Sequence, residues 1–316
     1  LPFDLDIRHL SCPKITLENL ATQQTLRVSC VGSVHIQQKG KEIHADLLIE
    51  EIQSENRLEV VAVSSLEDKK LEATLEVTVA EPQSLCLFTG APSIPAFDVI
   101  CKVKGRHKKP TAFDVQGQVY SLNLPHTSCI KEPISLQAVG TISLDQTSPL
   151  FLSVKECHIY DKSLDLKSAF TLTPSLRPTF IDLSLQIDGP SNLSCLLPIE
   201  GDLEAHVYLD DSSFLASVHS PHLKVDQKSF APADFYIFAA KHEEQWTGNS
   251  RGHFESEIFP FKESFQFSLQ ETLGHFKKID ISDLSITCAE SKLGGLFTYN
   301  FEKNDYWGNF FFLANE

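Results

Sequence analysis

Residues 71–81, LEATLEVTVAE, show the pattern that recurs along this chain: apolar side chains at every second position, separated by glutamate and threonine. A period of two places the apolar side chains on one face of a β-strand and the polar ones on the other. Comparable alternation returns at residues 181–188, 203–209 and 265–270. We therefore expect a protein made mostly of β-sheet that carries one long apolar face, with no strong amphipathic helix between the strands.

Short polar links separate the expected strands. The opening region, residues 5–18, reads as two short strands broken at Cys12-Pro13, because proline cannot donate to a central ladder. The links that follow are too short for the crossovers that parallel neighbours need. We expect antiparallel strands at residues 28–37, 43–52, 58–64, 71–79, 97–103, 113–120, 126–133, 134–144, 150–160, 164–172 and 180–187, and a last group that ends with 293–301 and 307–313.

Clusters of proline and glycine divide this pattern into three segments. Residues 81–95 hold three prolines and one glycine, and residues 188–192 read Asp-Gly-Pro-Ser-Asn. We predict a first β-meander at 1–81, a second β segment at 82–188 that opens with a non-strand insertion, and a third at 189–316. They amount to roughly 20 to 25 strands. The predicted fold class is all-β: a long, mainly antiparallel, curled sheet with a groove, built from repeated hairpins.

The composition excludes some partners. The chain carries 42 acidic and 27 basic residues, a formal charge of -15, which repels nucleic-acid phosphates and disfavours anionic membrane surfaces. No apolar run reaches the length of about 18 residues that a membrane-spanning helix needs. Methionine is absent, so we expect the numbering to start inside a longer precursor.

Residues with catalytic potential form no known motif. The chain has no G-x-S-x-G elbow, P-loop, H-E-x-x-H or G-x-G-x-x-G pattern, so we expect no enzyme, metal or cofactor. His219 and His222 flank Ser-Pro, which predicts a solvated turn, and His242 is expected in a loop. A solvated hairpin tip, or alternatively a site for lipid phosphates or an acidic partner, is predicted for the basic run Lys102, Lys104, Arg106, Lys108 and Lys109.

Eight cysteines leave two interpretations open. None has C-x-x-C spacing, which excludes a zinc ribbon or a thioredoxin-like site. A free thiol in an apolar strand acts as a small hydrophobic side chain, whereas an even count allows disulfides in an oxidising compartment. The cysteines are Cys12, Cys30, Cys86, Cys101, Cys129, Cys157, Cys195 and Cys288.

Four stretches resemble the TamB family and, more broadly, the AsmA-like, bridge-type lipid transport proteins. They share short strands of the form apolar-x-apolar-x-x-Leu, then a glycine-opened strand, then a meander that ends in Glu-Pro, here Glu81-Pro82. Many TamB-like chains continue with paired glycines and a short helical segment, where this chain has Gln83-Ser84-Leu85-Cys86. The stretches are FDLDIRHLSCPKITLEN, LRVSCVGSVHIQQKGKEIHADLLIEE, RLEVVAVSSLEDKKLEATLEVTVAEP and IDISDLSITCAESKLGGLFTYNFE.

This resemblance implies a function without catalysis. TamB-like proteins are periplasmic and are anchored to the inner membrane, here by a segment not present in this chain. Their sheet curls into a groove that moves phospholipid toward the outer membrane, in concert with a BamA-like outer-membrane barrel, TamA. The implied role is in outer-membrane biogenesis, as part of a translocation and assembly module. The partners are then phospholipid and the barrel, with no nucleic acid.

The candidate site is the apolar face of the strands. We expect the alternating aliphatic residues to line a lumen for lipid, which an apolar concave face and a polar convex face would form. Period-two alternation fits the core of a β-sandwich equally well. The alternative function is therefore a tandem of β-sandwich modules in adhesion or secretion. The groove candidates are Leu71, Leu75, Val77, Val79, Ile181, Leu183, Leu185, Ile187, Leu203, Val207 and Leu209.

Overall fold

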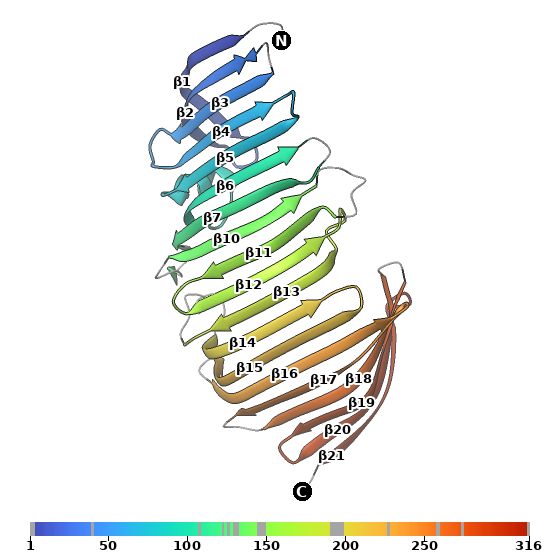
Figure 1. Ribbon diagram of the computed structural model, residues 1–316. Coiled ribbons are helices and arrows are strands. Elements are labelled where there is room, and N and C mark those ends of the chain that lie inside the picture. The colour runs from blue at the N-terminus through green and yellow to red at the C-terminus, as the bar shows by residue number, and fades with distance from the viewer. Residues whose placement is uncertain are drawn as a thin grey trace. The chain divides into compact units, whose positions relative to one another are not determined.

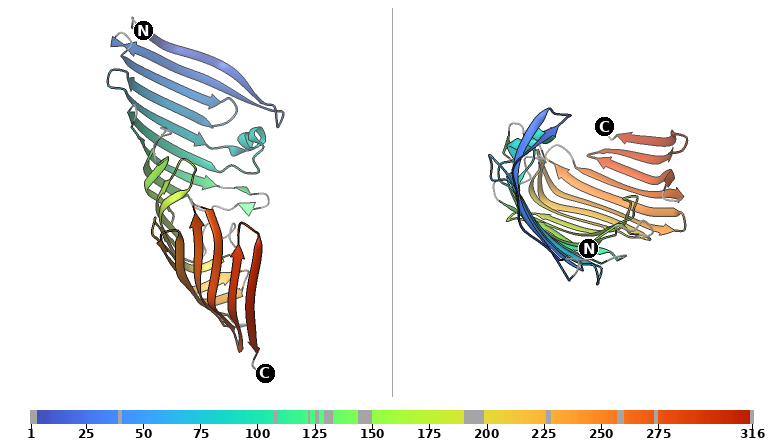
Figure 2. Two further views of the ribbon diagram at one scale, coloured as in Figure 1. Left: turned by 90° about the vertical axis from the view of Figure 1, so that its right-hand side faces the viewer. Right: turned by 90° about the horizontal axis from the view of Figure 1, so that it is seen from above.

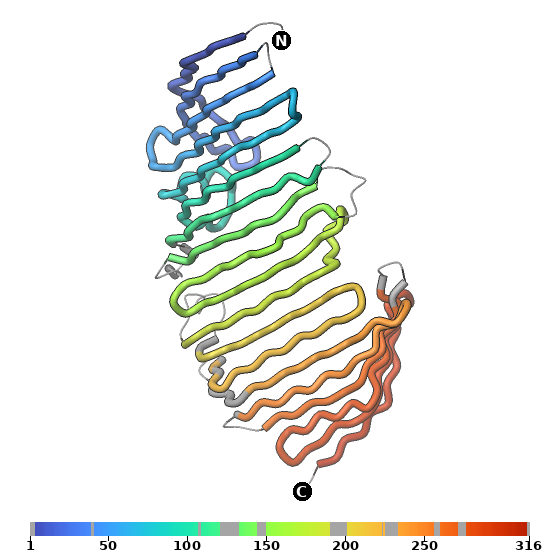
Figure 3. Tube along the Cα trace, in the orientation of Figure 1, coloured from blue at the N-terminus to red at the C-terminus, as the bar shows by residue number. Residues whose placement is uncertain are grey.

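The protein is all-β, as the alternation predicts. Nineteen strands belong to one antiparallel sheet, and two short strands form a separate pair. In the trace of Figure 3, consecutive strands run back and forth as neighbours within each part of the chain. The computed structural model describes residues 4–38, 41–106, 109–121, 123–124, 127–128, 133–143, 150–189, 199–225, 228–256, 260–272 and 275–314.

The chain divides into two compact units. The first comprises Leu1–Lys162 and Thr171–Arg177, and the second comprises Ser163–Phe170 and Pro178–Glu316. The three segments expected from the proline clusters, 1–81, 82–188 and 189–316, stay a prediction.

The first unit is an antiparallel meander in which β7 pairs with β10 across the short hairpin β8–β9 (Figure 1). The other strands up to β7 pair with their neighbours in sequence, and β10 pairs with β11. The elements are β1 (Leu5–Asn19), β2 (Gln24–Gln37), β3 (Glu42–Glu51), β4 (Arg57–Ser65), β5 (Lys70–Val79), α1 (Pro82–Thr89), β6 (Ala96–Arg106), β7 (Thr111–Ser121), β8 (Asn123–Leu124), β9 (Thr127–Ser128), β10 (Ile134–Ile142) and β11 (Leu152–Tyr160).

The second unit continues the same plan, and each strand from β13 to β21 pairs antiparallel with the next. Figures 1 and 2 show this sheet curling, with β18–β21 turned out of the plane of β13–β16. The strands are β12 (Leu164–Leu172), β13 (Pro178–Ile187), β14 (Ile199–Leu209), β15 (Ser213–Val225), β16 (Lys228–His242), β17 (Gln245–Ser256), β18 (Phe261–Thr272), β19 (His275–Cys288), β20 (Ser291–Asn300) and β21 (Asp305–Ala314).

The opening region differs from the sequence prediction, because β1 is one continuous strand and not two. Its pairing with β2 shifts register between Ile7 and Leu10 and again between Cys12 and Ile15. Pro13 therefore lies in an irregularity of a strand whose one described partner is β2. A proline at such a position costs no ladder hydrogen bond, so the strand continues past it.

The non-strand insertion contains the helix α1. Pro82 occupies the first turn, and Gly90, with φ 75°, ends the helix in the left-handed region that glycine tolerates. At the other end of the helix, Asn19 Nδ2 and Thr22 Oγ1 donate to the carbonyl oxygen of Phe88, at 2.8 and 2.9 Å. The short helix is thus tied to the β1–β2 turn, and Figure 2 shows it as the coiled ribbon beside the sheet of the first unit.

Asn56 fixes the start of α1. Its side chain is only 6% exposed. Its Nδ2 donates to Glu51 Oε2 at 2.7 Å and to the carbonyl oxygen of Glu81 at 2.8 Å, while its Oδ1 accepts the Glu81 N–H at 2.9 Å. Ser84 Oγ, in the first turn of the helix, also donates to Glu51 Oε2, at 2.9 Å. The β3–β4 hairpin and the helix therefore share one hydrogen-bonded anchor.

The sheet of each unit is a single layer over the described residues. Apart from the contact between α1 and β2, the closest contacts between described elements join strands that pair with each other. Figures 1 and 2 show the strands of each unit in one layer. The chain exposes 20020 Å², whereas a compact monomer of 35.3 kDa exposes about 13,000 Å². The packed double layer of a β-sandwich, which the alternation also allowed, is absent from the described part of either unit.

We predict that Asn56→Ala destabilises the protein by about 1–3 kcal/mol, because it removes the hydrogen bonds that the buried Asn56 side chain makes to the Glu81 backbone and to Glu51. Urea unfolding measures this loss. The Gly90 N–H, which donates to the Cys86 carbonyl oxygen, should exchange faster in the variant because α1 loses its anchor. The exposed Gln137→Ala provides the control, with a change within about 0.5 kcal/mol. Equal effects of the two substitutions would contradict the anchoring role.

Candidate functional site

The first unit carries an apolar face in continuous rows. Residues directly opposite one another across antiparallel strands have their side chains on the same face. Because the strands lie about 4.8 Å apart, a row across seven strands extends about 29 Å. One such row, from β3 to β11, is half-buried throughout and consists of Leu47, Val60, Leu75, Cys101, Val115, Ala138 and Cys157.

The four groove candidates on β5 all lie on this face. Leu75 belongs to the row above, and Val77 stands opposite Leu58 and Val99 in the next row. Leu71 is 45% exposed, whereas Val79, next to α1, is 5% exposed. On β5 the exposed fraction therefore falls from Leu71 to Val79, the residue beside the helix.

The second unit carries an apolar face of the same kind. Of the seven candidates there, Ile181, Leu183 and Ile187 stand directly opposite Leu209, Val207 and Leu203, and Leu185 lies opposite Ala205. All seven share one face of β13 and β14, and their contact with lipid stays a prediction. A row that begins with two of them crosses nine strands and consists of Ile181, Leu209, Phe214, Ala239, Gly248, Phe267, Ile281, Phe297 and Gly308.

Aromatic side chains are frequent on the apolar face from β15 onward, and none of them is among the groove candidates predicted from the sequence. A Cβ on Gly248 would lie 2.8 Å from the Phe267 ring, and one on Gly252 would lie 2.6 Å from the Phe235 ring. Each glycine therefore leaves space that a phenylalanine of an adjacent strand fills. Phe254 and Phe261, also opposite each other, stack with ring centroids 5.0 Å apart. The F-x-F spacing at Phe265 and Phe267 was the sequence signal for these residues.

The middle of the apolar face in the first unit carries no charge among the described residues. Cys101, in the central row, has a thiol whose pKa is raised by burial and by the nearby Asp114 carboxylate. The thiol therefore stays protonated at neutral pH and acts as a small apolar side chain. At the margin, Glu51 is held by the Asn56 anchor beside α1.

Glu263 is an acidic residue on the apolar face of the second unit. It stands opposite Gly252 on β17 and Ile286 on β19. Ser250 Oγ, on a residue only 4% exposed, donates to Glu263 Oε1 at 2.6 Å. The other carboxylate oxygen, Oε2, is buried, and no described protein group donates a hydrogen bond to it. A buried oxygen without a donor costs stability, so this pair is a local weakness of the face.

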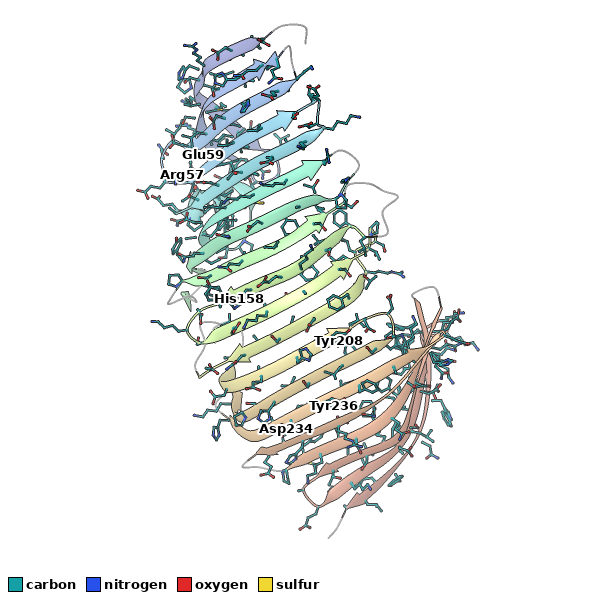
Figure 4. All side chains as sticks on the ribbon, in the orientation of Figure 1. Arg57, Glu59, His158, Tyr208, Asp234 and Tyr236 are labelled. Carbon is teal, nitrogen blue, oxygen red and sulfur yellow. The ribbon has the colours of Figure 1, made fainter. Side chains whose placement is uncertain are left out.

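The opposite face of each sheet is polar, and Figure 4 labels some of its side chains. Arg57 and Glu59 represent it on β4 in the first unit. In the second unit, His219 hydrogen-bonds through Nδ1 to Asp234 Oδ1 across β15 and β16, and this bond raises the pKa of His219. Glu204, opposite His219 on β14, adds to the shift.

The polar loops predicted from the sequence are only partly found. The turn expected at His219 to His222 is wrong: both residues lie inside β15, and Ser220-Pro221 falls where the pairing with β14 shifts register. His242 ends β16 and is followed by a turn at Glu243-Glu244.

Most of the basic run lies within β6, and Lys109 lies in the β6–β7 turn, where the hairpin tip was predicted. Lys102, Lys104 and Arg106 are exposed on the polar face of β6, and Lys104 Nζ lies 3.5 Å from Glu72 Oε2. Lys108, Cys129 and Cys195 lie outside the described residues. The structure joins none of the six described cysteines to another.

Two chemical features are absent from the part of the chain that the structure describes. No group of three or more His, Cys, Asp or Glu side chains there could hold a metal ion. No helix there has the length and apolar character needed to cross a membrane.

We predict a pH-dependent contribution from the His219–Asp234 pair. The folded-state pKa of His219 is raised, so the stabilisation is fully present below the unfolded pKa of about 6.5 and is lost as pH rises through the folded value. Asp234→Asn should lower the urea midpoint at pH 5 more than at pH 8. The exposed Asp211→Asn serves as the control, and a pH-independent effect of Asp234→Asn would contradict the pairing.

We also predict that Ser250→Ala destabilises the protein by about 1–3 kcal/mol, because it leaves both Glu263 oxygens without a donor. The double variant Ser250→Ala with Glu263→Leu removes both polar groups and should regain the wild-type stability or exceed it. Thermal and urea unfolding of the single and double variants measure the two effects. A double variant as unstable as Ser250→Ala would show that the carboxylate is not the source of the cost.

The geometry thus presents two apolar faces, one on each unit, with charged groups on the opposite faces and at the margins. The chain matches no family model and no curated protein.

Proposed function

We propose that this protein is a groove-type lipid conduit. The apolar face of each unit holds the acyl chains of phospholipid, while the polar face stays in water. Transport of this kind needs a continuous apolar surface and no catalytic residue, so the proposal includes no reaction step.

The observation that carries the proposal is the uncovered apolar row. In the first unit the row through Leu75 and Cys101 crosses seven strands without a charged side chain. Figure 1 shows the described strands of this unit in one layer, with no second sheet over them. Soluble monomers rarely leave a contiguous apolar patch of more than a few hundred Å² open to water. Such a face is typical of a surface that another apolar molecule covers.

The energetics of a lipid match this face. Each methylene group removed from water stabilises by about 0.8 kcal/mol, so a 16-carbon acyl chain gains about 12 kcal/mol on full burial. A single-layer sheet contributes one side of that shelter. Within the second unit the sheet is curled, so its own later strands can contribute a further side (Figure 2). In the first unit, the middle of the face carries no charge among the described residues, which avoids the desolvation cost that a charged lining would impose.

The cellular setting of the proposal rests on the resemblance to TamB-like proteins. We place the conduit in the periplasm, where it would move phospholipid between the inner and outer membranes. Its protein partner would be a BamA-like barrel of the TamA kind. The alternative, an adhesion or secretion protein made of β-sandwich modules, has less support, because the described part of either unit lacks the second sheet of a sandwich.

We predict that Leu75→Glu and Leu185→Glu each reduce phospholipid loading several-fold. A carboxylate in the row would lose its hydration when an acyl chain covers it, which weakens lipid binding. In the lipid-free protein the same side chain can stay in contact with water, so the loss of folding stability is small. Native mass spectrometry of the gently purified protein, together with binding of a fluorescent phospholipid, measures loading. The melting temperature should fall by only a few degrees.

Matched controls lie next to these residues on the opposite face. Thr74→Glu and Ser184→Glu add the same charge one residue away and should leave lipid loading unchanged. Wild-type protein that neither carries nor takes up phospholipid would refute the proposed function. A loss of stability in parallel with the loss of loading would instead identify Leu75 and Leu185 as packed core.

A further inference from the structure

Two cysteines stand directly opposite each other at the edge of the first unit. Cys12 on β1 and Cys30 on β2 are register partners in the antiparallel ladder. Partners of this kind have Cα atoms about 4.5 or 5.5 Å apart and side chains on the same face, whereas disulfides need a Cα separation of about 4.4–6.8 Å. We propose that Cys12 and Cys30 form a cross-strand disulfide that locks β1 onto the sheet.

No other pair of described cysteines has this placement. Cys101 faces Leu75 and Val115, and Cys157 faces Ala138. Cys288 faces Phe261 and Ser291, and Cys86 lies on α1. The other described thiols therefore lack a cysteine directly across the ladder.

The surroundings of the pair favour its oxidation. Both thiols are half-buried, so a small disulfide reagent can reach them. The pair lies between two register shifts of the β1–β2 ladder, one before Leu10 and one after Cys12. Backbone at a bulge adjusts more easily than a regular ladder, which helps the two sulfur atoms reach bonding distance.

The bond forms by thiol–disulfide exchange with a low-molecular-weight disulfide such as oxidised glutathione. One cysteine thiolate attacks a glutathione sulfur, which gives a mixed disulfide and releases one glutathione thiolate. The second cysteine thiolate then attacks the protein sulfur of the mixed disulfide and displaces the second glutathione. Two protein thiols are oxidised, one glutathione disulfide is reduced, and the two protons released balance the two glutathione thiolates.

The bond would stabilise β1, which is held along one side only among the described strands. β1 pairs with β2 along one side, and no described strand pairs with its other side. Its ladder is interrupted twice, and a strand held in this way frays at low free-energy cost. The cross-link joins residues 12 and 30 around the β1–β2 turn, to which α1 is tied through Asn19 and Thr22. Locking the ladder therefore also secures the margin of the apolar face. This inference does not rest on lipid binding.

The test uses the whole chain, incubated natively with an excess of oxidised over reduced glutathione, then denatured and alkylated. We expect six alkyl groups per chain instead of the eight that fully reduced protein takes up, since the sequence contains eight cysteines. Trypsin should release the linked peptides HLSCPK, residues 9–14, and VSCVGSVHIQQK, residues 28–39. Alkylation of all eight thiols, or links that join other cysteines instead, would overturn the proposal.

Hydrogen exchange supplies a second readout. Reduction of the oxidised wild type should speed exchange of the β1 amides by about tenfold or more, because the reduced strand opens independently of β2. Cys12→Ser and Cys30→Ser should show the fast rate with or without reductant. Cys101→Ser, which removes a thiol without a cysteine opposite, should behave as wild type. β1 exchange that does not change on reduction in a chain shown to carry the link would overturn the locking role.

Discussion

The structure depends on antiparallel strand pairing, which aligns the apolar side chains of successive strands on one face of the sheet. Because paired residues in adjacent strands point to the same side, each added strand extends the apolar face by another row. In the first unit this relation links Leu47 on β3 to Cys157 on β11 through five intervening strands. A globular protein would bury such a face under a second layer, but the described part of this chain has none. The side chains are sheltered only by their neighbours within the sheet.

That arrangement makes the margins of the sheet important for stability. In the first unit, α1 covers one end of the strands, and Val28 and Val79, near the helix, are among the few well-buried apolar residues. At the far edge of the second unit, β21 has no such cover: all its residues are exposed, with Tyr306 at 77% and Trp307 at 61%. Burial does not depend on the helix alone, because Ile187, Ala233 and Ala239 of the second unit are also well buried, among their neighbours in the sheet.

The distribution of charge follows the same division into faces. Carboxylates, lysines and histidines pair with one another on the polar side, as Lys104 does with Glu72 and His219 with Asp234. On the apolar side of the first unit a raised pKa keeps Cys101 neutral. Glu263 breaks this rule in the second unit, where Ser250 gives it a single hydrogen bond. A lipid conduit would tolerate one such carboxylate among many apolar rows.

The sequence by itself determined the fold class and the faces. Alternation at residues 71–79 and 181–187 specifies the faces locally, since successive side chains of a strand point to opposite sides. The short polar links between strands favour antiparallel pairing, because parallel neighbours need longer crossovers. All eleven groove candidates accordingly lie on the apolar face of their unit.

Only the tertiary structure decided whether that face is covered, because a pattern of period two is the same in an open sheet and in a sandwich. It also decided that β1 runs through Pro13, that Asn56 anchors α1, and that Cys12 meets Cys30. These features join residues distant along the chain through register shifts and side-chain hydrogen bonds, which no local pattern of the sequence specifies.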